Sequence, residues 1–120
     1  MEHLVFVYGT LKRGRGANRF LQTSEYLGEG FTVPKYRMTG EGFPMIQLDD
    51  RSGHVVKGEI YRVNDMVLDT LDRYEGHPNF YTRKKIFVRT GQEEIEVNIY
   101  ECNTMGSSKI DPNDNGILEW

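Results

Sequence analysis

Short apolar runs separated by glycine and proline constrain the fold of this 120-residue chain more than any other feature of its sequence. Between residues 26 and 48, four glycines and two prolines interrupt runs of three or four strand-forming residues, such as residues 31–33 and 45–48. Short strands with such kinks are typical of small barrels, because a closed sheet must bend its strands sharply. The pattern therefore favours a small β-barrel.

One segment, residues 65–75, has helical rather than strand periodicity. Its apolar residues recur at the i, i+1, i+4, i+7 spacing of a single helix face. They are Val67, Leu68, Leu71 and Tyr74. Asn64 is a favourable N-cap, and Gly76 can end the helix in the left-handed conformation. Asp69, Asp72 and Arg73 are expected on its solvated face. A shorter helix of two turns is expected over residues 17–24.

The remaining strands follow from alternation and from turn residues. A long strand is expected over residues 55–63, with Gly58 marking a bulge or a close neighbour. Residues 81–89 and 95–100 should form a hairpin whose polar face, including Glu96 and Asn98, is in solvent. The chain is thus predicted to be a single domain, residues 1–120, of α+β class, with a small mixed, largely antiparallel β-barrel and flanking helices.

Composition narrows the classes of function. A net charge of −3 argues against a nucleic-acid surface as the main function. The single Cys102 allows no internal disulfide, and no cluster of histidine or cysteine indicates a metal site. No apolar stretch approaches the length of a membrane helix. We therefore expect a cytoplasmic protein, monomeric or weakly dimeric, without a metal, a cofactor, or a nucleic-acid or membrane partner.

The first strand, residues 4–8, is apolar on both faces and runs into a glycine-rich loop. A strand of this kind is covered on both sides. Gly9 lacks a Cβ, so it can take backbone angles closed to other residues and lets a ligand approach the main chain. The amides of Gly9, Thr10 and Leu11 can then form a binding site for a carboxylate or an oxyanion. An ordinary strand-to-loop turn is the alternative.

Nucleotide-binding loops do not fit this segment. Gly14 is followed by Arg15 and Gly16, where a phosphate loop needs lysine and a hydroxyl residue, and Arg19 replaces the third glycine of a dinucleotide fingerprint. The basic residues of the loop form either a solvated surface or a guide for acidic substrates. They are Lys12, Arg13, Arg15 and Arg19.

Four motifs, taken in order, resemble the γ-glutamylcyclotransferase-like family. They are Tyr8-Gly9-Thr10-Leu11, Val56-Lys57-Gly58-Glu59-Ile60-Tyr61, Leu71-Asp72-Arg73-Tyr74-Glu75-Gly76 and Tyr81-Thr82-Arg83. The opening residues 4–14, with Asn18, are most similar to the γ-glutamylamine cyclotransferase branch. The resemblance extends to Tyr100. Residues 116–120 are only faintly similar to the Gly-Asp-Trp ending of bacterial members, so a role of the tail in closing the pocket is open.

The resemblance implies a cavity at the Tyr8–Leu11 loop, a catalytic glutamate at Glu75, a pocket tyrosine at Tyr81 and a loop proline at Pro44. It implies cyclisation of a γ-glutamyl group to 5-oxoproline with release of an amine, by a protein that needs no nucleophile of its own. Members of the family act on γ-glutamyl amino acids, γ-glutamyl-ε-lysine or γ-glutamylated antibiotic intermediates. A non-catalytic protein of the same fold that binds a small ligand is the alternative.

The local sequence adds a physical reason for choosing Glu75. It lies in the last turn of the predicted helix, where exposed carbonyls and the helix dipole disfavour a carboxylate. Its neighbours Tyr74, Phe80 and Tyr81 can desolvate it further, and both effects raise the pKa of the carboxyl group. Glu59, in the middle of a strand, is expected to buttress the site. A surface glutamate at a fraying helix end is the alternative for Glu75.

Overall fold

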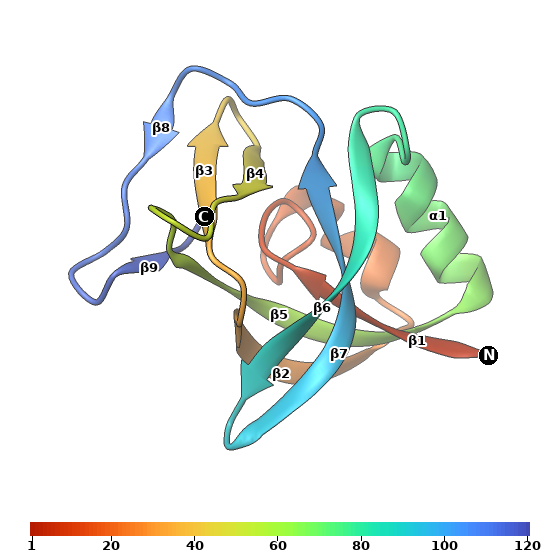
Figure 1. The fold of residues 1–120 in the computed structure, drawn as a ribbon. Helices are drawn as coiled ribbons and strands as arrows, with labels where there is room; N and C mark the ends of the chain where they lie inside the picture. Colours follow the sequence, from red (N-terminus) through yellow and green to blue (C-terminus); the bar gives the residue numbers. More distant parts are fainter.

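The computed structural model describes residues 1–120 and has a closed barrel at its centre (Figure 1). Around the barrel the strands follow the order β1 (Glu2–Val7), β7 (Glu93–Cys102), β6 (Tyr81–Thr90), β2 (Glu25–Thr32) and β5 (Val55–Asn64), and β5 pairs back with β1. Among the pairings of these five strands, only that between β1 and β7 is parallel. The predicted mixed, largely antiparallel barrel is confirmed.

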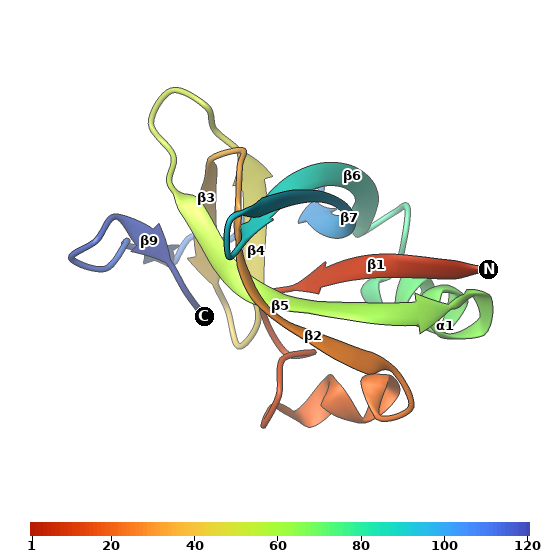
Figure 2. The same ribbon diagram turned by 90° about the horizontal axis from the view of Figure 1, so that it is seen from below.

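A second, smaller sheet stands at one end of the barrel. It contains β3 (Tyr36–Gly40), β4 (Pro44–Leu48) and β8 (Lys109–Ile110). The last strand, β9 (Ile117–Leu118), pairs in parallel with the start of β5. Figure 2 shows the tail extending along this end of the molecule, away from the N-terminus. The polar tail is therefore bound to both sheets through its two short strands.

The main helix is α1 (Asp65–Glu75), with the bounds that its periodicity predicts. The side chain of Asn64 accepts a hydrogen bond from the amide of Val67 at 2.8 Å, and Gly76 has a left-handed conformation with φ of 69°. Leu68 and Leu71 face the barrel and are buried. Both capping predictions are confirmed.

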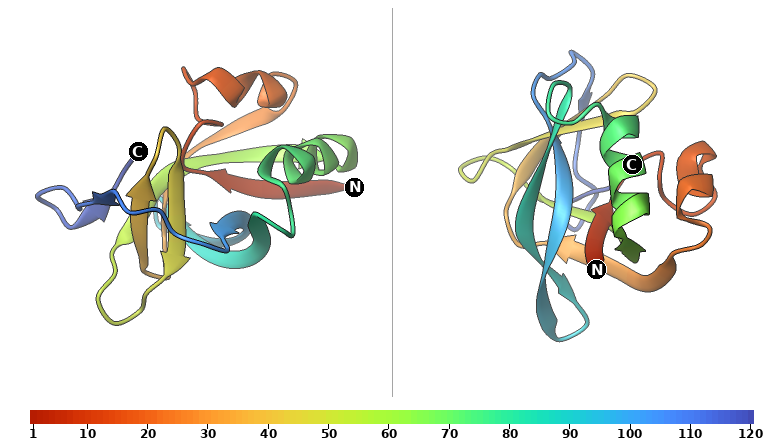
Figure 3. Two further views of the ribbon diagram at one scale, coloured as in Figure 1. Left: turned by 90° about the horizontal axis from the view of Figure 1, so that it is seen from above. Right: turned by 90° about the vertical axis from the view of Figure 1, so that its right-hand side faces the viewer.

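The shorter helix differs from the prediction. It is a 3-10 helix, η1 (Gly16–Leu21), rather than two turns over residues 17–24. Only Ala17 and Leu21 are buried, which gives too little apolar contact to sustain a longer helix. Figure 3 shows η1 beside α1 on one side of the barrel, where the rings of Phe20 and Tyr74 lie 5.1 Å apart.

Strand β1 separates two hydrophobic cores. Val5 and Val7 point to the core between the barrel and the helices, whereas Phe6 and Tyr8 point to the core inside the barrel. Since strand side chains alternate between faces, a strand between two cores must be apolar throughout. The expectation that this strand is covered on both sides is confirmed.

The predicted solvent-facing hairpin holds only for the first part of β7. Glu96 is exposed, but Asn98 is buried, with 4% of its surface exposed, and donates to the carbonyl oxygen of Leu4 at 3.0 Å. The reason is that β7 pairs with β1 as well as with β6 and closes the barrel. Hairpin alternation in the sequence gives no sign of this second pairing.

Gly58 marks a close neighbour rather than a bulge. A Cβ at this position would lie 2.5 Å from Cζ of Phe6 and from the carbonyl oxygen of Val7. The irregularity in the pairing of β5 with β2 lies on the other strand, between Tyr26 and Gly28.

Candidate active site

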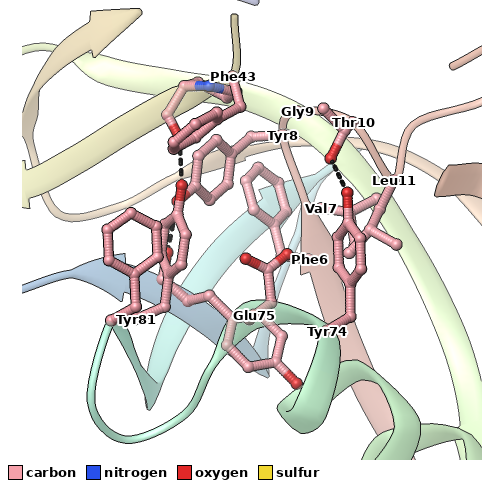
Figure 4. A pocket seen from close by; sticks show the side chains of 13 residues that line it. Phe6, Val7, Tyr8, Gly9, Thr10, Leu11, Phe43, Tyr74, Glu75 and Tyr81 are labelled. Carbon is pink, nitrogen blue, oxygen red and sulfur yellow. Dashed lines mark hydrogen bonds between the residues drawn. The ribbon is translucent and has the colours of Figure 1, made fainter. Parts of the chain in front are cut away.

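A cavity of about 210 Å³ opens where the end of β1, the start of β4 and the C-terminal end of α1 meet. Its thirteen lining residues are mostly hydrophobic (Figure 4). They are Phe6, Val7, Tyr8, Gly9, Thr10, Leu11, Phe43, Pro44, Tyr74, Glu75, Phe80, Tyr81 and Tyr100. All seven residues predicted for the site are among them, from four separate segments of the chain.

The loop after β1 offers free hydrogen-bond donors to this cavity. The carbonyls of Gly9 and Thr10 accept from the amides of Lys12 and Ala17, each at 3.0 Å, and so fold the loop. The amides of Gly9, Thr10 and Leu11 donate to no acceptor within the chain. Because buried amides are nearly always paired, three adjacent free donors lining a cavity favour an anionic ligand there.

Gly9 is required for a different reason from the expected one. Its φ is not positive, so the predicted backbone freedom is not used. Instead, a Cβ on Gly9 would lie 2.5 Å from Cγ and 2.8 Å from Cδ of Pro44. The ring of Pro44 lies against the main chain of the loop, and only glycine leaves room for it.

Polar side chains outside the cavity bind the main chain of the loop after β1. Glu59 accepts from the amide of Arg13 at 2.8 Å, and Asn18 donates to the carbonyl oxygen of Leu11 at 2.8 Å. Asn18 and Glu59 both also contact the hydroxyl of Tyr61. Glu59 thus supports the loop from outside the cavity, as the sequence suggested.

The basic residues of the loop are engaged within the molecule and do not line the cavity. Lys12 is buried and donates to the main-chain oxygen of Trp120, to which Arg15 also donates at 3.1 Å. The guanidinium of Arg13 lies over the ring of Tyr26, and Arg19 donates to the carbonyl of Gly16. The tail is therefore tied to the loop, although Trp120 does not line the cavity.

Two of the tyrosines direct their protons into the protein. The hydroxyl of Tyr81 donates to the carbonyl oxygen of Pro44 at 2.6 Å, and that of Tyr8 donates to the carbonyl oxygen of Tyr100. Burial raises the pKa of both phenols, so they stay neutral. Because each hydroxyl already donates its proton to a carbonyl, its oxygen can only accept a hydrogen bond from a ligand.

Glu75 carries the only carboxyl group of the cavity. Figure 4 shows it rising from the end of α1 into the middle of the lining, between Tyr81 and Tyr74. None of the hydrogen bonds or ion pairs of the structure involves its side chain, and burial raises its pKa from 4.5 to about 7. The cause of this shift is burial, which the sequence predicted from the aromatic neighbours of Glu75.

Asp72, which the sequence placed on the solvated face, lies in a polar network one turn before Glu75. Its carboxylate accepts from Arg83 Nε at 2.8 Å and from the hydroxyl of Tyr100 at 2.7 Å, and its side chain is only 18% exposed. Arg83 also donates to Asn98 at 3.0 Å. The prediction was wrong because both partners come from β6 and β7, against which this end of the helix lies.

Six lining residues were not among the predicted site residues. Phe43, Tyr74 and Phe80 each adjoin a predicted residue, and the sequence had marked the last two only as neighbours that desolvate Glu75. Tyr74 also binds the loop, since its hydroxyl lies 2.9 Å from Oγ1 of Thr10. Val7 precedes the predicted Tyr8, whereas Phe6 and Tyr100 are strand residues with no local signal for a site.

This arrangement defines a class of chemistry. One carboxyl group with a pKa of about 7 faces a loop of free amides inside apolar walls that contain no serine, cysteine, lysine or histidine. Such a site can move a proton on a small anionic molecule without an attacking side chain of its own. No helix of the structure is long and apolar enough to cross a bilayer.

Comparison with known proteins agrees with this class. The sequence model of the family described as gamma-glutamyl cyclotransferase, AIG2-like, matches residues 5–117. A Vibrio cholerae protein provisionally named a gamma-glutamylcyclotransferase is 37% identical over 115 residues, covering 95% of this chain and 96% of the relative. The gammaglutamylaminecyclotransferase of Rattus norvegicus is 36% identical over 93 residues, 71% of this chain and 62% of the rat protein. The crystal structure of an AIG2-like protein from Mus musculus has a TM-score of 0.79 at 29% identity, covering 88% of this chain and 80% of the mouse chain.

The chain therefore belongs to the gamma-glutamyl cyclotransferase, AIG2-like family. It is an enzyme of the γ-glutamylcyclotransferase type.

Proposed function

We propose that the protein is a γ-glutamyl(amine) cyclotransferase that releases 5-oxoproline and a free amine, with Glu75 as general acid and base. The observation that carries this proposal is the unpartnered carboxyl group of Glu75, with a pKa of about 7, in a cavity that also holds the free loop amides. A carboxyl group with this pKa can both accept and return a proton near neutral pH.

In the reaction, the α-amine of the γ-glutamyl group attacks its own γ-carbonyl carbon. A bond forms between that carbon and the α-nitrogen, and the amide bond to the leaving amine breaks. Two protons leave the α-ammonium, and two reach the leaving amine, which departs as an ammonium. Glu75 can carry them one at a time, first as a base toward the α-nitrogen and then as an acid toward the leaving nitrogen.

The remaining predicted residues hold the substrate folded for this attack. The amides of Gly9, Thr10 and Leu11 bind the α-carboxylate, and the hydroxyl oxygens of Tyr8 and Tyr81 accept from the α-ammonium. Pro44 fixes the loop through its contact with Gly9 and fixes Tyr81 through its carbonyl. Positioning matters greatly here, because the substrate supplies its own nucleophile.

The decisive experiment is to incubate the protein with a panel of γ-glutamyl amines and to detect 5-oxoproline by mass spectrometry. Release of 5-oxoproline together with a stoichiometric amount of free amine is the expected result. Thermal stabilisation by panel members without any product would instead identify a binding protein of the same fold.

The carboxylate site is tested with Gly9→Ala and the matched control Gly16→Ala. The new methyl group should displace Pro44 and the loop amides, and we expect kcat/KM to fall by at least about tenfold through KM. A Cβ at Gly16 meets nothing within 4 Å, and its φ is not positive, so the control should keep wild-type kinetics. An unchanged KM in a folded Gly9→Ala protein would exclude this role of the loop.

A further inference from the structure

The cavity has two chemically different sides, which Glu75 separates. Figure 4 shows Thr10, Leu11 and Tyr74 on one side of the Glu75 carboxyl group and Phe43 and Tyr81 on the other. The proposed α-carboxylate site lies on the first side, so the γ-carbonyl comes near Glu75. The leaving amine must then extend across the second side.

The second side is built from aromatic rings. Phe80 lies against both of its neighbours, with ring centroids 5.9 Å from Phe43 and 5.0 Å from Tyr81, both edge-on. We call these three residues the aromatic rim. Phe80 is 42% exposed although it lines the cavity, so its ring borders the opening. An additional ring could join this arrangement with favourable geometry.

The aromatic rim offers no partner to a leaving group that carries a carboxylate. The lining contains no arginine, lysine or histidine that could pair with a carboxylate, and Glu75 would repel one. Glu41, in the turn before Phe43, already accepts hydrogen bonds from Ser107 and Ser108 and does not line the cavity. A carboxylate placed here would lose hydration without compensation, which is costly.

We propose that the aromatic rim is the leaving-group subsite and selects uncharged arylalkyl amines over amino acids, with Phe80 as its main specificity determinant. This inference rests on the proposed function, because it concerns the amine that the cyclisation releases. The aromatic rim would then determine which leaving amine is accepted, whereas Glu75 only transfers the protons.

Three substrates that differ stepwise provide the test. They are γ-glutamyl methylamide, which is too short to reach the rim, γ-glutamyl phenethylamide, which adds a ring, and γ-glutamyl-phenylalanine, which adds a carboxylate to the phenethylamide. We expect kcat/KM for the phenethylamide to exceed that for the methylamide by at least about tenfold, since apolar contacts discriminate on this scale. The phenylalanine compound should be slower than the phenethylamide by about a hundredfold, because its carboxylate is desolvated unpaired.

Phe80→Ala should reduce the preference for the phenethylamide over the methylamide to within about threefold. This ratio does not depend on how much of the protein is folded. Phe87→Ala is the matched control, since Phe87 is 49% exposed on β6 and does not line the cavity, and it should keep the wild-type ratio.

The outcomes separate this inference from the proposed function. If no member of the panel of γ-glutamyl amines, these three included, yields 5-oxoproline, the proposed function fails. If other members of the panel are cyclised but the phenethylamide is not, only the subsite assignment is overturned. If all three are cyclised but the methylamide or the phenylalanine compound matches the phenethylamide, only the subsite assignment is overturned. An unchanged ratio in Phe80→Ala would also overturn it.

Discussion

Asp72 and Glu75 occupy successive turns of the same helix, and both are withdrawn from solvent, but their surroundings differ. Asp72 accepts hydrogen bonds from Arg83 and Tyr100 and anchors α1 to β6 and β7. Glu75 has no polar partner and faces the cavity. Its partners make the first carboxylate an ion-pair anchor, whereas burial without a partner raises the pKa of the second to about 7.

The difference shows that one turn of a helix can carry both a residue that stabilises the fold, Asp72, and a residue that is available for proton transfer, Glu75. A paired carboxylate stabilises the fold, and its charge is already engaged by donors of the protein. An unpaired carboxylate costs stability when it ionises but is available for proton transfer. The two positions should therefore respond oppositely to loss of their charge.

The largest expected effect is on turnover in Glu75→Gln. The amide keeps the shape of the side chain but cannot exchange the proton, so kcat/KM should fall by about 10²–10⁴-fold. The wild-type acid limb, with its midpoint near pH 7, should disappear from the residual rate. Initial rates of 5-oxoproline formation between pH 5 and 9 provide the measurement.

Asp69→Asn, on the exposed face of the same helix, is the control for that loss and should keep the wild-type rate. Turnover by Glu75→Gln within a few-fold of wild type would remove Glu75 from the mechanism.

Asp72→Asn should show the opposite pattern, in which stability is lost and chemistry is kept. Removing one charge leaves Arg83 without its carboxylate in a half-buried site, and we expect a loss of about 2–3 kcal/mol in the free energy of unfolding. Urea denaturation measures it, and the exposed Asp69–Arg73 pair should contribute far less. A stable Asp72→Asn protein that is as inactive as Glu75→Gln would break the comparison.

The pH dependence of stability gives an effect of similar size. Because folding raises the pKa of Glu75 from 4.5 to about 7, the folded protein keeps a proton in this range that the unfolded chain has lost. The wild-type protein should therefore lose stability relative to Glu75→Gln as pH rises from about 4.5 to about 7, with no further change above. The difference should reach about 3 kcal/mol in urea titrations at several pH values. A constant difference across this range would mean that Glu75 is not desolvated.

Tyr100→Phe should have the smallest effect. It removes the hydroxyl that donates to Asp72 at 2.7 Å, while Arg83 remains bound to the carboxylate. We expect a loss of about 1.5 kcal/mol in stability, typical of a hydrogen bond to a charged group. Turnover should stay within a few-fold of wild type. The substitution keeps the aromatic ring, and the main-chain carbonyl of residue 100 still accepts from the hydroxyl of Tyr8. A large loss of turnover at unchanged stability would give this hydroxyl a part in the chemistry.

The sequence by itself determined the features that depend on neighbouring residues. The periodicity and capping residues of residues 65–75 predict α1 and its ends, and the punctuated strands predict the barrel. The motifs marked seven residues that all line the cavity, and the position of Glu75 among aromatic neighbours predicted its raised pKa. These inferences succeed because each signal lies within a few residues of the feature it predicts.

Only the tertiary structure decided which distant residues meet. Arg83 reaches Asp72 and Tyr100 lines the cavity because β6 and β7 pass the end of α1, and Asn98 is buried because β7 also pairs with β1. Gly9 is needed because Pro44 lies against it, and Phe43 comes to lie beside Phe80 in the same way. Barrel closure sets these contacts, and they join residues far apart in the chain, so no local pattern of propensity or periodicity records them.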